Sequence, residues 1–332
     1  MKINKNTSLP LDKFIEFALY DKDTGYYMKK NPFGAEGDFI TAPNITRLFS
    51  EIIAIWIITF WKSIGSPKKF NILELGAGNG EMMKVIISTL KNFPECFNNC
   101  KFLIHEKSTF LKKQQHKNLK LENVIWEDDI KKFDSCPTIF LANEFFDALP
   151  IKQFFKKNEG WVERFVNLKE IDHAKFEEQF IDIKKIEKEL NFEISKDQEI
   201  IEYSPSSFEY LKDICSLINN NNGGLLIIDY GYLNSKMHET LQAINKHKYS
   251  NVLEDIGQSD ITYNINFNIF KKYIDQFDDL NSIFSNQKKF LTRMGIIQRA
   301  EIVSENIPFS KKSDLFYRIR RLIDEKQMGE LF

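Results

Sequence analysis

The sequence predicts an α/β protein with a Rossmann-like, mostly parallel sheet, an N-terminal helical segment and an inserted smaller lobe. Two observations support this prediction: short apolar runs alternate with helical stretches, and each run leads into a glycine turn or an acidic residue. This alternation is typical of parallel strands joined by crossover helices. The expected strands are Phe70–Leu75, Lys101–Glu106, Asn123–Trp126, Thr138–Asn143 and Leu225–Tyr230.

The segment before the first strand is expected to be helical around a long loop. Residues Leu11 to Tyr20 place apolar side chains at helical spacing, which predicts a short amphipathic helix. Residues 21–44 contain several glycines and prolines, which predict a long loop. The aromatic residues within this segment indicate that the loop is ordered and functional. Residues Ile45 to Ser63 then predict one long buried helix, which ends near Gly65.

An insertion is expected between the fourth and fifth strands. Residues Lys152 to Leu168 form two alternating segments around Asn158-Glu159-Gly160, which predicts a β-hairpin. The hairpin and the Lys/Glu-rich stretch after it form the predicted lobe, while the asparagine run 219–222 predicts a loop. The predicted division is N-terminal helices and covering loop in 1–66, the sheet domain in 67–150 and 200–332, and the inserted lobe in 151–199.

Composition argues against several classes of protein. Lys plus Arg (46) nearly balances Asp plus Glu (47), so no overall field draws the chain to nucleic acid or an anionic membrane. The four cysteines form no C-x-x-C pair, so neither a metal site nor a disulfide framework is predicted. The longest apolar run, Ile52 to Trp61, is shorter than the roughly 20 residues that a membrane span needs. With no leader pattern visible, we expect a cytoplasmic, bacterial protein without membrane insertion.

The most informative motif is the glycine turn ELGAGNG after the first strand. Gly76, Gly78 and Gly80 let the backbone turn sharply and approach a ligand closely. The spacing differs from the dinucleotide pattern G-x-G-x-x-G, and Glu74 stands two positions before the first glycine. A carboxylate there repels a pyrophosphate but suits the cationic amine of a methionine. The motif therefore favours S-adenosylmethionine as cofactor, over a dinucleotide or a purely structural turn.

Acidic residues follow the next two strands. Glu106 ends the second strand, where a carboxylate can accept hydrogen bonds from ribose hydroxyls; the alternative is a solvated strand end. Asp128 and Asp129 follow the third strand, where one of them is placed to bond the adenine amino group. The sequence does not decide which, and the other is expected to be a helix N-cap.

The fourth strand ends in NEFFDALP, at the position beside the transferred group in a doubly wound sheet. We assign Asn143 to the cofactor site and the carboxylates of Glu144 and Asp147 to the acceptor. Two carboxylates there can orient an arginine guanidinium, which is a bidentate partner for them. The alternative is helix capping with Phe145 and Phe146 as core aromatics.

Seven segments occur in an order that resembles the MidA family of S-adenosylmethionine-dependent methyltransferases, relatives of the mitochondrial complex I assembly-factor methyltransferase. They are GDFITAPN (37–44), LELGAGNGEMM (73–83), LANEFFDALPIKQF (141–154), EYSP (202–205), IIDYG (227–231), DITYNINF (260–267) and MGELF (328–332). The resemblance spans Gly25 to the C-terminus and implies a class I methyltransferase fold with an added lobe. It also implies symmetric dimethylation of an arginine in the 49-kDa-type subunit of complex I.

The same resemblance implies further site residues and marks three departures. Asp38 and Thr41 are expected in a loop over the cofactor, and Asp229 with Tyr230 in the acceptor pocket. Asn44 stands where the family usually has Glu, and Asn266 where it often has Asp. The chain stops at MGELF, where relatives continue with a further strand, so an edge strand of the sheet is expected to be missing.

The sequence thus predicts an enzyme whose acceptor is a protein side chain, with Glu144, Asp147 and Asp229 as the catalytic residues. A rival hypothesis is a non-catalytic assembly chaperone that binds the complex I subunit on a methyltransferase fold. A third hypothesis, a nicotinamide-dependent oxidoreductase, lacks the expected third-glycine spacing. The oligomeric state is not predicted.

Overall fold

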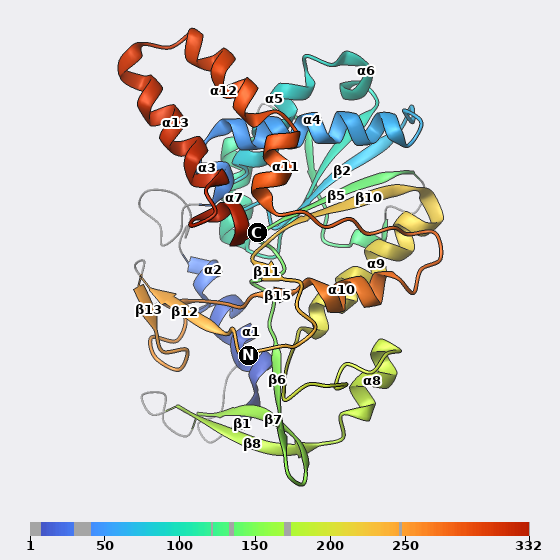
Figure 1. The fold of residues 1–332 in the computed structure, drawn as a ribbon, viewed down its shortest axis with the longest axis vertical. Helices are drawn as coiled ribbons and strands as arrows, with labels where there is room; N and C mark the ends of the chain where they lie inside the picture. Colours follow the sequence, from blue (N-terminus) through green and yellow to red (C-terminus); the bar gives the residue numbers. More distant parts are fainter. Residues whose placement is uncertain are drawn as a thin grey trace. The chain divides into compact units, whose positions relative to one another are not determined.

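The computed structural model describes residues 8–29, 41–120, 122–132, 136–168, 174–245 and 248–331 (Figure 1). The chain divides into two compact units, which are described separately below. The parallel unit comprises Asn31–Glu144, Ser216–Tyr230 and Ile283–Phe332, and the antiparallel unit comprises Met1–Lys30, Phe145–Cys215 and Gly231–Ser282. This division differs from the predicted one, because residues before Asn31 and residues 231–282 group with the predicted insert.

A five-stranded sheet of parallel strands forms the centre of the parallel unit. Its order is β10-β5-β2-β3-β4, with bounds Gly223–Ile228, Thr138–Asn143, Phe70–Leu75, Cys100–His105 and Val124–Trp126. All five predicted strands are present, and the mostly parallel Rossmann-like fold is confirmed. The central strand β2 is buried along its whole length, whereas the edge strand β10 is half-buried. Because β2 and β5 are adjacent and parallel near the centre of the sheet, their carboxyl ends lie side by side at the same edge.

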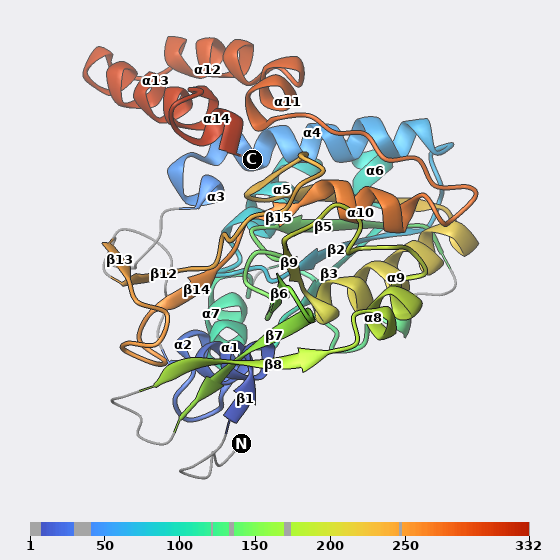
Figure 2. The same cartoon turned by 60° about the horizontal axis from the view of Figure 1, so that its bottom comes forward.

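Helices pack their apolar side chains with the sheet into one core. Those before and between the strands are α3 (Ala42–Ile45), α4 (Arg47–Ser63), α5 (Glu81–Leu90) and α6 (Pro94–Phe97), while α7 (Thr109–Asn118) and the short 3₁₀ helix Ile130–Lys132 lie outside this cluster. Those at the C-terminal end are α11 (Gln287–Arg293), α12 (Ile296–Glu305), α13 (Phe309–Ile323) and α14 (Met328–Leu331). Figure 2 shows α11 to α14 stacked beside α4.

Two helix predictions need correction. The long helix expected over Ile45–Ser63 is present as α4, but it begins at Arg47, because Thr46 has an extended backbone and caps α4 by accepting a hydrogen bond from the Leu48 N–H. The asparagine run is mostly helical rather than a loop. Helix α9 (Pro205–Asn221) continues through Asn221 and ends at Asn222, whose φ is 69°.

The antiparallel unit is built around the predicted hairpin. Strands β6 (Lys152–Lys157) and β7 (Gly160–Asn167) pair antiparallel across Asn158-Glu159, which confirms the hairpin. The strand β7 pairs with β8 (Lys175–Ile181) on one side and with β6 and β1 (Ser8–Pro10) on the other. The strand β9 (Ile200–Tyr203) extends the sheet beyond β6.

The rest of the antiparallel unit consists of short elements. The helices are α1 (Leu11–Tyr20), as predicted, α2 (Tyr26–Lys29), which lies where a loop was expected, α8 (Lys184–Leu190) and α10 (Phe267–Ile274). The remaining strands are β11 (Gly231–Tyr232), β12 (Gln242–Asn245), β13 (Lys248–Ser250), β14 (Asp260–Thr262) and β15 (Ile265–Asn266). Across the described parts of both units, every helix is too short or too polar to cross a membrane.

Candidate cofactor and active site

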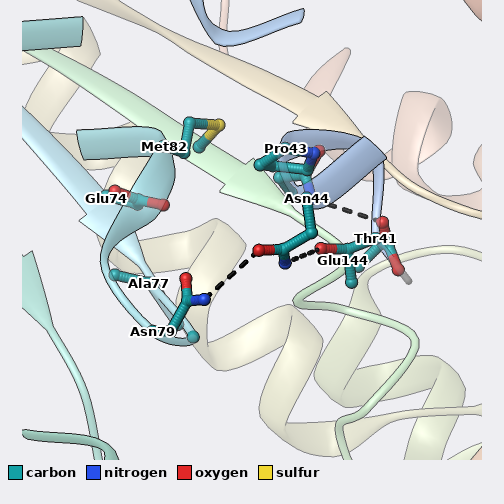
Figure 3. Close-up of a pocket in the computed structure, with 11 residues that line it drawn as sticks. Thr41, Pro43, Asn44, Glu74, Ala77, Asn79, Met82 and Glu144 are labelled. Carbon is teal, nitrogen blue, oxygen red and sulfur yellow. Dashed lines mark hydrogen bonds between the residues drawn. The ribbon is translucent and has the colours of Figure 1, made fainter. Parts of the chain in front are cut away.

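A hollow of about 370 Å³, partly open to solvent, lies in the parallel unit at the carboxyl ends of β2 and β5 (Figure 3). Four segments line it: the start of α3, the end of β2, the glycine turn with α5, and the end of β5. The lining residues are Thr41, Pro43, Asn44, Glu74, Gly76, Ala77, Gly78, Asn79, Met82, Asn143 and Glu144. In a doubly wound sheet, ligands bind at this position.

The glycine turn forms one wall of the hollow. Gly76, Gly78 and Gly80 have φ angles of 62°, 52° and 83°, in the left-handed region that side chains disfavour. A Cβ on Gly80 would lie 3.1 Å from Leu119 Cδ1, which is tighter than ordinary contact. The Gly80 N–H donates to the Ala77 carbonyl at 2.7 Å, which closes the turn just before α5 begins. At Gly76 and Gly78 the wall is therefore backbone without a side chain, which a ligand can approach closely.

Glu74 is a buried acid with an unsatisfied oxygen. Its side chain is 3% exposed, and its Oε2 has no hydrogen-bond partner among the described residues. Burial, together with the nearby charge of Glu106, raises the pKa of Glu74 to about 8, although the Met83 backbone N–H bonds the carboxylate. Because an unpaired buried carboxylate is costly, the site favours either a bound proton or a cationic ligand.

The end of β5 supplies Asn143 and Glu144. Asn143 Oδ1 is buried and, within the described ranges, accepts no hydrogen bond. Glu144 has a φ of 48°, which is unfavourable for a residue with a side chain, and its N–H donates to the Ile228 carbonyl at 2.9 Å. Backbone strain of this kind gathers at functional sites. The sheet therefore holds a strained acidic residue at the wall of the hollow.

Glu106 is buried, but it is not among the residues that line the hollow. Its Oε1 accepts from the Ser108 N–H at 2.9 Å and its Oε2 from Gln115 Nε2 at 3.0 Å. Burial raises its pKa, while these bonds act in the opposite direction. The solvated strand end that the sequence left open is wrong, because Glu106 is only 7% exposed.

Asp128 and Asp129 are both exposed, and they differ in their contacts. Asp129 Oδ1 accepts from the Lys131 N–H at 3.0 Å at the start of the 3₁₀ helix, so Asp129 is the capping residue of the pair. Asp128 forms an ion pair with Lys112 of α7, which lowers its pKa. Contact with adenine remains a prediction, and the geometry leaves Asp128 as the better candidate.

The remaining predicted residues lie in different parts of the molecule. Thr41 lines the hollow, whereas Asp38 lies outside the described residues. Asp229 is 1% exposed at the end of β10, where its Oδ1 accepts from the Tyr230 N–H. Asp147 is 5% exposed and belongs to the antiparallel unit. The structure thus brings together at the hollow the predicted residues Thr41, Glu74, Gly76, Gly78, Asn143 and Glu144, while Gly80 closes the turn behind it.

The two departures from the family pattern have different structural roles. Asn44 lines the hollow: its Nδ2 donates to Thr41 Oγ1 at 2.8 Å and its Oδ1 accepts from Asn79 Nδ2 at 3.2 Å (Figure 3). Asn266 caps α10 by accepting from the Asn268 and Ile269 N–H groups. Asn266 is therefore architectural, while Asn44 connects the start of α3 to the glycine turn.

The hollow lies where Rossmann-like enzymes bind nucleotides, and a glycine turn forms one of its walls. Together with the unsatisfied Glu74 and the strained Glu144, it defines a Rossmann-like group-transfer enzyme. The chain belongs to the family described as "Putative S-adenosyl-L-methionine-dependent methyltransferase", whose model matches residues 52–283. This confirms the resemblance seen in the motifs, and the chain is an S-adenosylmethionine-dependent methyltransferase.

Similar proteins cover nearly the whole chain. "Protein arginine methyltransferase NDUFAF7, mitochondrial" is 26% identical in Xenopus tropicalis, over 100% of this chain and 82% of that protein. The protein of the same name in Danio rerio is 28% identical, over 100% and 83%. A superfamily member from Burkholderia thailandensis, solved with S-adenosyl-homocysteine, has a TM-score of 0.82 at 21% identity, over 98% of this chain and 86% of that one. The latter likeness shows the fold.

The residues of the hollow fit S-adenosylmethionine. The unsatisfied Glu74 oxygen matches the cationic amine of the methionine part, and the bare glycine backbone leaves room for a close approach. The unsatisfied Asn143 oxygen adds a second acceptor at the end of β5. When bound, the cofactor supplies a methyl group activated by its sulfonium.

Proposed function

We propose that this enzyme methylates an arginine side chain of a protein, by symmetric dimethylation, and that the protein is the 49-kDa-type subunit of respiratory complex I. The observation that carries the arginine assignment is the placement of Glu144. This acidic residue, whose backbone is strained, lies at the wall of the cofactor hollow. A carboxylate is the natural partner of a guanidinium, which donates N–H groups in a planar fork.

The names of the relatives support arginine as the acceptor, because the proteins from Xenopus tropicalis and Danio rerio are called protein arginine methyltransferases. The complex I subunit and the symmetric product rest on the motif resemblance alone. The assignment of Asp229 to the acceptor rests on that resemblance, and the assignment of Asp147 rests on its place in the segment NEFFDALP after β5.

The residues then have the following proposed roles. Gly76, Gly78 and Gly80 cradle the cofactor, Glu74 and Asn143 bind its methionine part, and Thr41 belongs to the covering segment, as does Asp38. Glu106 accepts from the ribose, and Asp128 bonds the adenine. Glu144 would hold the guanidinium by its N–H groups so that one nitrogen faces the methyl donor, and that nitrogen would release one proton to solvent as it takes the methyl group. Positioning of this kind, rather than a strong base, provides most of the acceleration in such a transfer.

The test is methylation of a defined partner. The purified enzyme is incubated with S-adenosylmethionine and the 49-kDa-type subunit of the same organism, and the subunit is analysed by mass spectrometry. We expect two methyl groups on one arginine, and loss of monomethylamine on fragmentation, which identifies the symmetric product. Methylation of lysine or of a small molecule instead would contradict the arginine assignment. A subunit that binds without any change in mass would favour the assembly chaperone.

A further inference from the structure

Gln115 is a fully buried polar residue that does not line the cofactor hollow. It lies on α7 with 0% of its surface exposed. Its Nε2 donates to the Gly78 carbonyl oxygen at 2.9 Å and to Glu106 Oε2 at 3.0 Å. Its Oε1 accepts from the indole Nε1 of Trp126 at 2.9 Å. One amide therefore connects the glycine turn, the end of β3 and the end of β4.

The chemistry of the three partners fixes the orientation of this amide. An indole N–H can only donate, so the Gln115 oxygen must face Trp126. A backbone carbonyl can only accept, so the nitrogen must face Gly78. The remaining N–H of the amide then points at Glu106 Oε2, which has to act as an acceptor. Since the Ser108 N–H bonds the other oxygen, both oxygens of Glu106 are fixed as acceptors.

We propose that Gln115 is a positioning residue for ribose recognition. Its amide holds the carboxylate of Glu106 and the glycine turn in a fixed position relative to each other. These are the two groups that we propose contact the nucleoside of the cofactor. The proposal rests on the ribose role given above to Glu106. It is independent of the acceptor, because it concerns binding of the cofactor alone.

The test is discrimination between two ligands that differ in the ribose. Calorimetry measures the affinity of the full chain for S-adenosylhomocysteine and for its 2′-deoxyribose analogue. The wild type is expected to prefer the ribose ligand by about tenfold, the value of a hydrogen bond to a charged group. In Gln115→Met, we expect the affinity for S-adenosylhomocysteine to fall and the preference to shrink toward equality.

Asn118→Ala is the matched control. Asn118 also lies on α7 and donates from Nδ2 to the carbonyl of Asn79 in the glycine turn at 2.9 Å, and no bond to Glu106 is found for it within the described structure. This variant should weaken both ligands equally and preserve the preference. Trp126→Phe provides a milder second variant, because it keeps Gln115 but removes the donor that orients its amide. We expect it to reduce the preference partially, by about threefold.

A preserved preference in folded Gln115→Met would overturn the proposal, and so would a preserved preference in Trp126→Phe if the methionine variant does not fold. A wild type that binds both ligands equally would overturn the ribose role of Glu106 and this proposal with it. Arginine methylation of the protein partner would remain a separate result in either case.

Discussion

The two units treat a buried glutamate in opposite ways. In the parallel unit, Glu74 retains an oxygen without a hydrogen-bond partner among the described residues. In the antiparallel unit, Glu202 is also buried, but Gln153 Nε2, the Thr240 hydroxyl and the N–H groups of Thr240 and Leu241 all donate to it. Burial raises the pKa of both carboxyls, and only Glu202 has several donors from its own chain that oppose the shift. Glu202 is thus part of the architecture, while Glu74 keeps an oxygen that we propose a ligand satisfies.

The largest effect is expected for Gly78→Val, which tests whether the glycine turn is the wall that the ligand meets. The branched side chain would occupy the hollow and would have to adopt a φ near 52°. Cofactor binding should fall by more than about a hundredfold in calorimetry, which corresponds to about 2.7 kcal/mol. An unchanged affinity would remove this turn from the cofactor site.

Glu144→Gln tests whether Glu144 acts on the acceptor rather than on cofactor binding in the parallel unit. The amide keeps the shape of the side chain but loses the charge that holds a guanidinium. Methyl transfer should fall by about tenfold to a hundredfold, because a charge-assisted bond is lost. Cofactor affinity should stay within about twofold of the wild type, since the glycine turn and Glu74 are untouched. Normal turnover would exclude Glu144 from the acceptor site.

The raised pKa of Glu74 predicts that cofactor binding depends on pH. Below about pH 8 the free protein holds a proton on Glu74, and a cationic ligand favours the carboxylate, so binding releases that proton. Between about pH 6 and 7.5, where the ligand amine stays protonated, affinity should rise by up to about tenfold per pH unit. Calorimetry in buffers of different ionisation enthalpy counts the protons released.

Glu74→Gln is the control for this pH dependence, since an amide cannot titrate. Its affinity for S-adenosylmethionine should be weaker at pH 7.5 and nearly flat over the same range. Proton release that persists in this variant would assign the pH dependence to another group.

The last prediction concerns stability without ligand, where the two glutamate variants should differ in sign. A carboxyl whose pKa is raised by folding favours the folded state below its unfolded pKa of about 4.5 and opposes it as the pH rises toward 8. Glu74→Gln should therefore leave the melting temperature at pH 8 unchanged or higher. Glu202→Gln should lower it, with a loss of about 1–3 kcal/mol in the free energy of unfolding. The amide NH₂ replaces the oxygen that accepts from the Thr240 hydroxyl, and the three N–H bonds to the other oxygen lose their charged acceptor. Equal losses in both variants would contradict the comparison.

The sequence predicted the parallel unit better than the antiparallel unit, for a physical reason. Strands buried on both faces are continuous apolar runs, so β2 and β5 were found with their bounds. The strand β8 escaped detection because five of its seven residues are exposed and only three of the seven are apolar. Its place is set by pairing with β7, which is a tertiary effect.

Site residues could be predicted from the sequence when they belong to one continuous motif. They could not be predicted when their role depends on contacts between separate segments. Glu74 was predicted from its place two positions before the first glycine, and Asn143 and Glu144 from their place at the end of an apolar strand. Gln115 was missed because it lies in the polar run KKQQHK, which resembles a solvated helix face. Only its partners on three other elements show that it is buried. Phe146 was ambiguous in the sequence, and its burial at 0% exposure against Phe270 shows that it is a core aromatic.

The central claim is that the hollow in the parallel unit binds S-adenosylmethionine through Glu74 and the glycine turn. The most direct test is a calorimetric titration of the purified chain at pH 7.5 with S-adenosylmethionine, with oxidised and reduced nicotinamide dinucleotides as controls. The account predicts micromolar binding of S-adenosylmethionine alone, and a weaker affinity in Glu74→Gln. Binding of a nicotinamide dinucleotide instead, or equal affinity in Glu74→Gln, would contradict it.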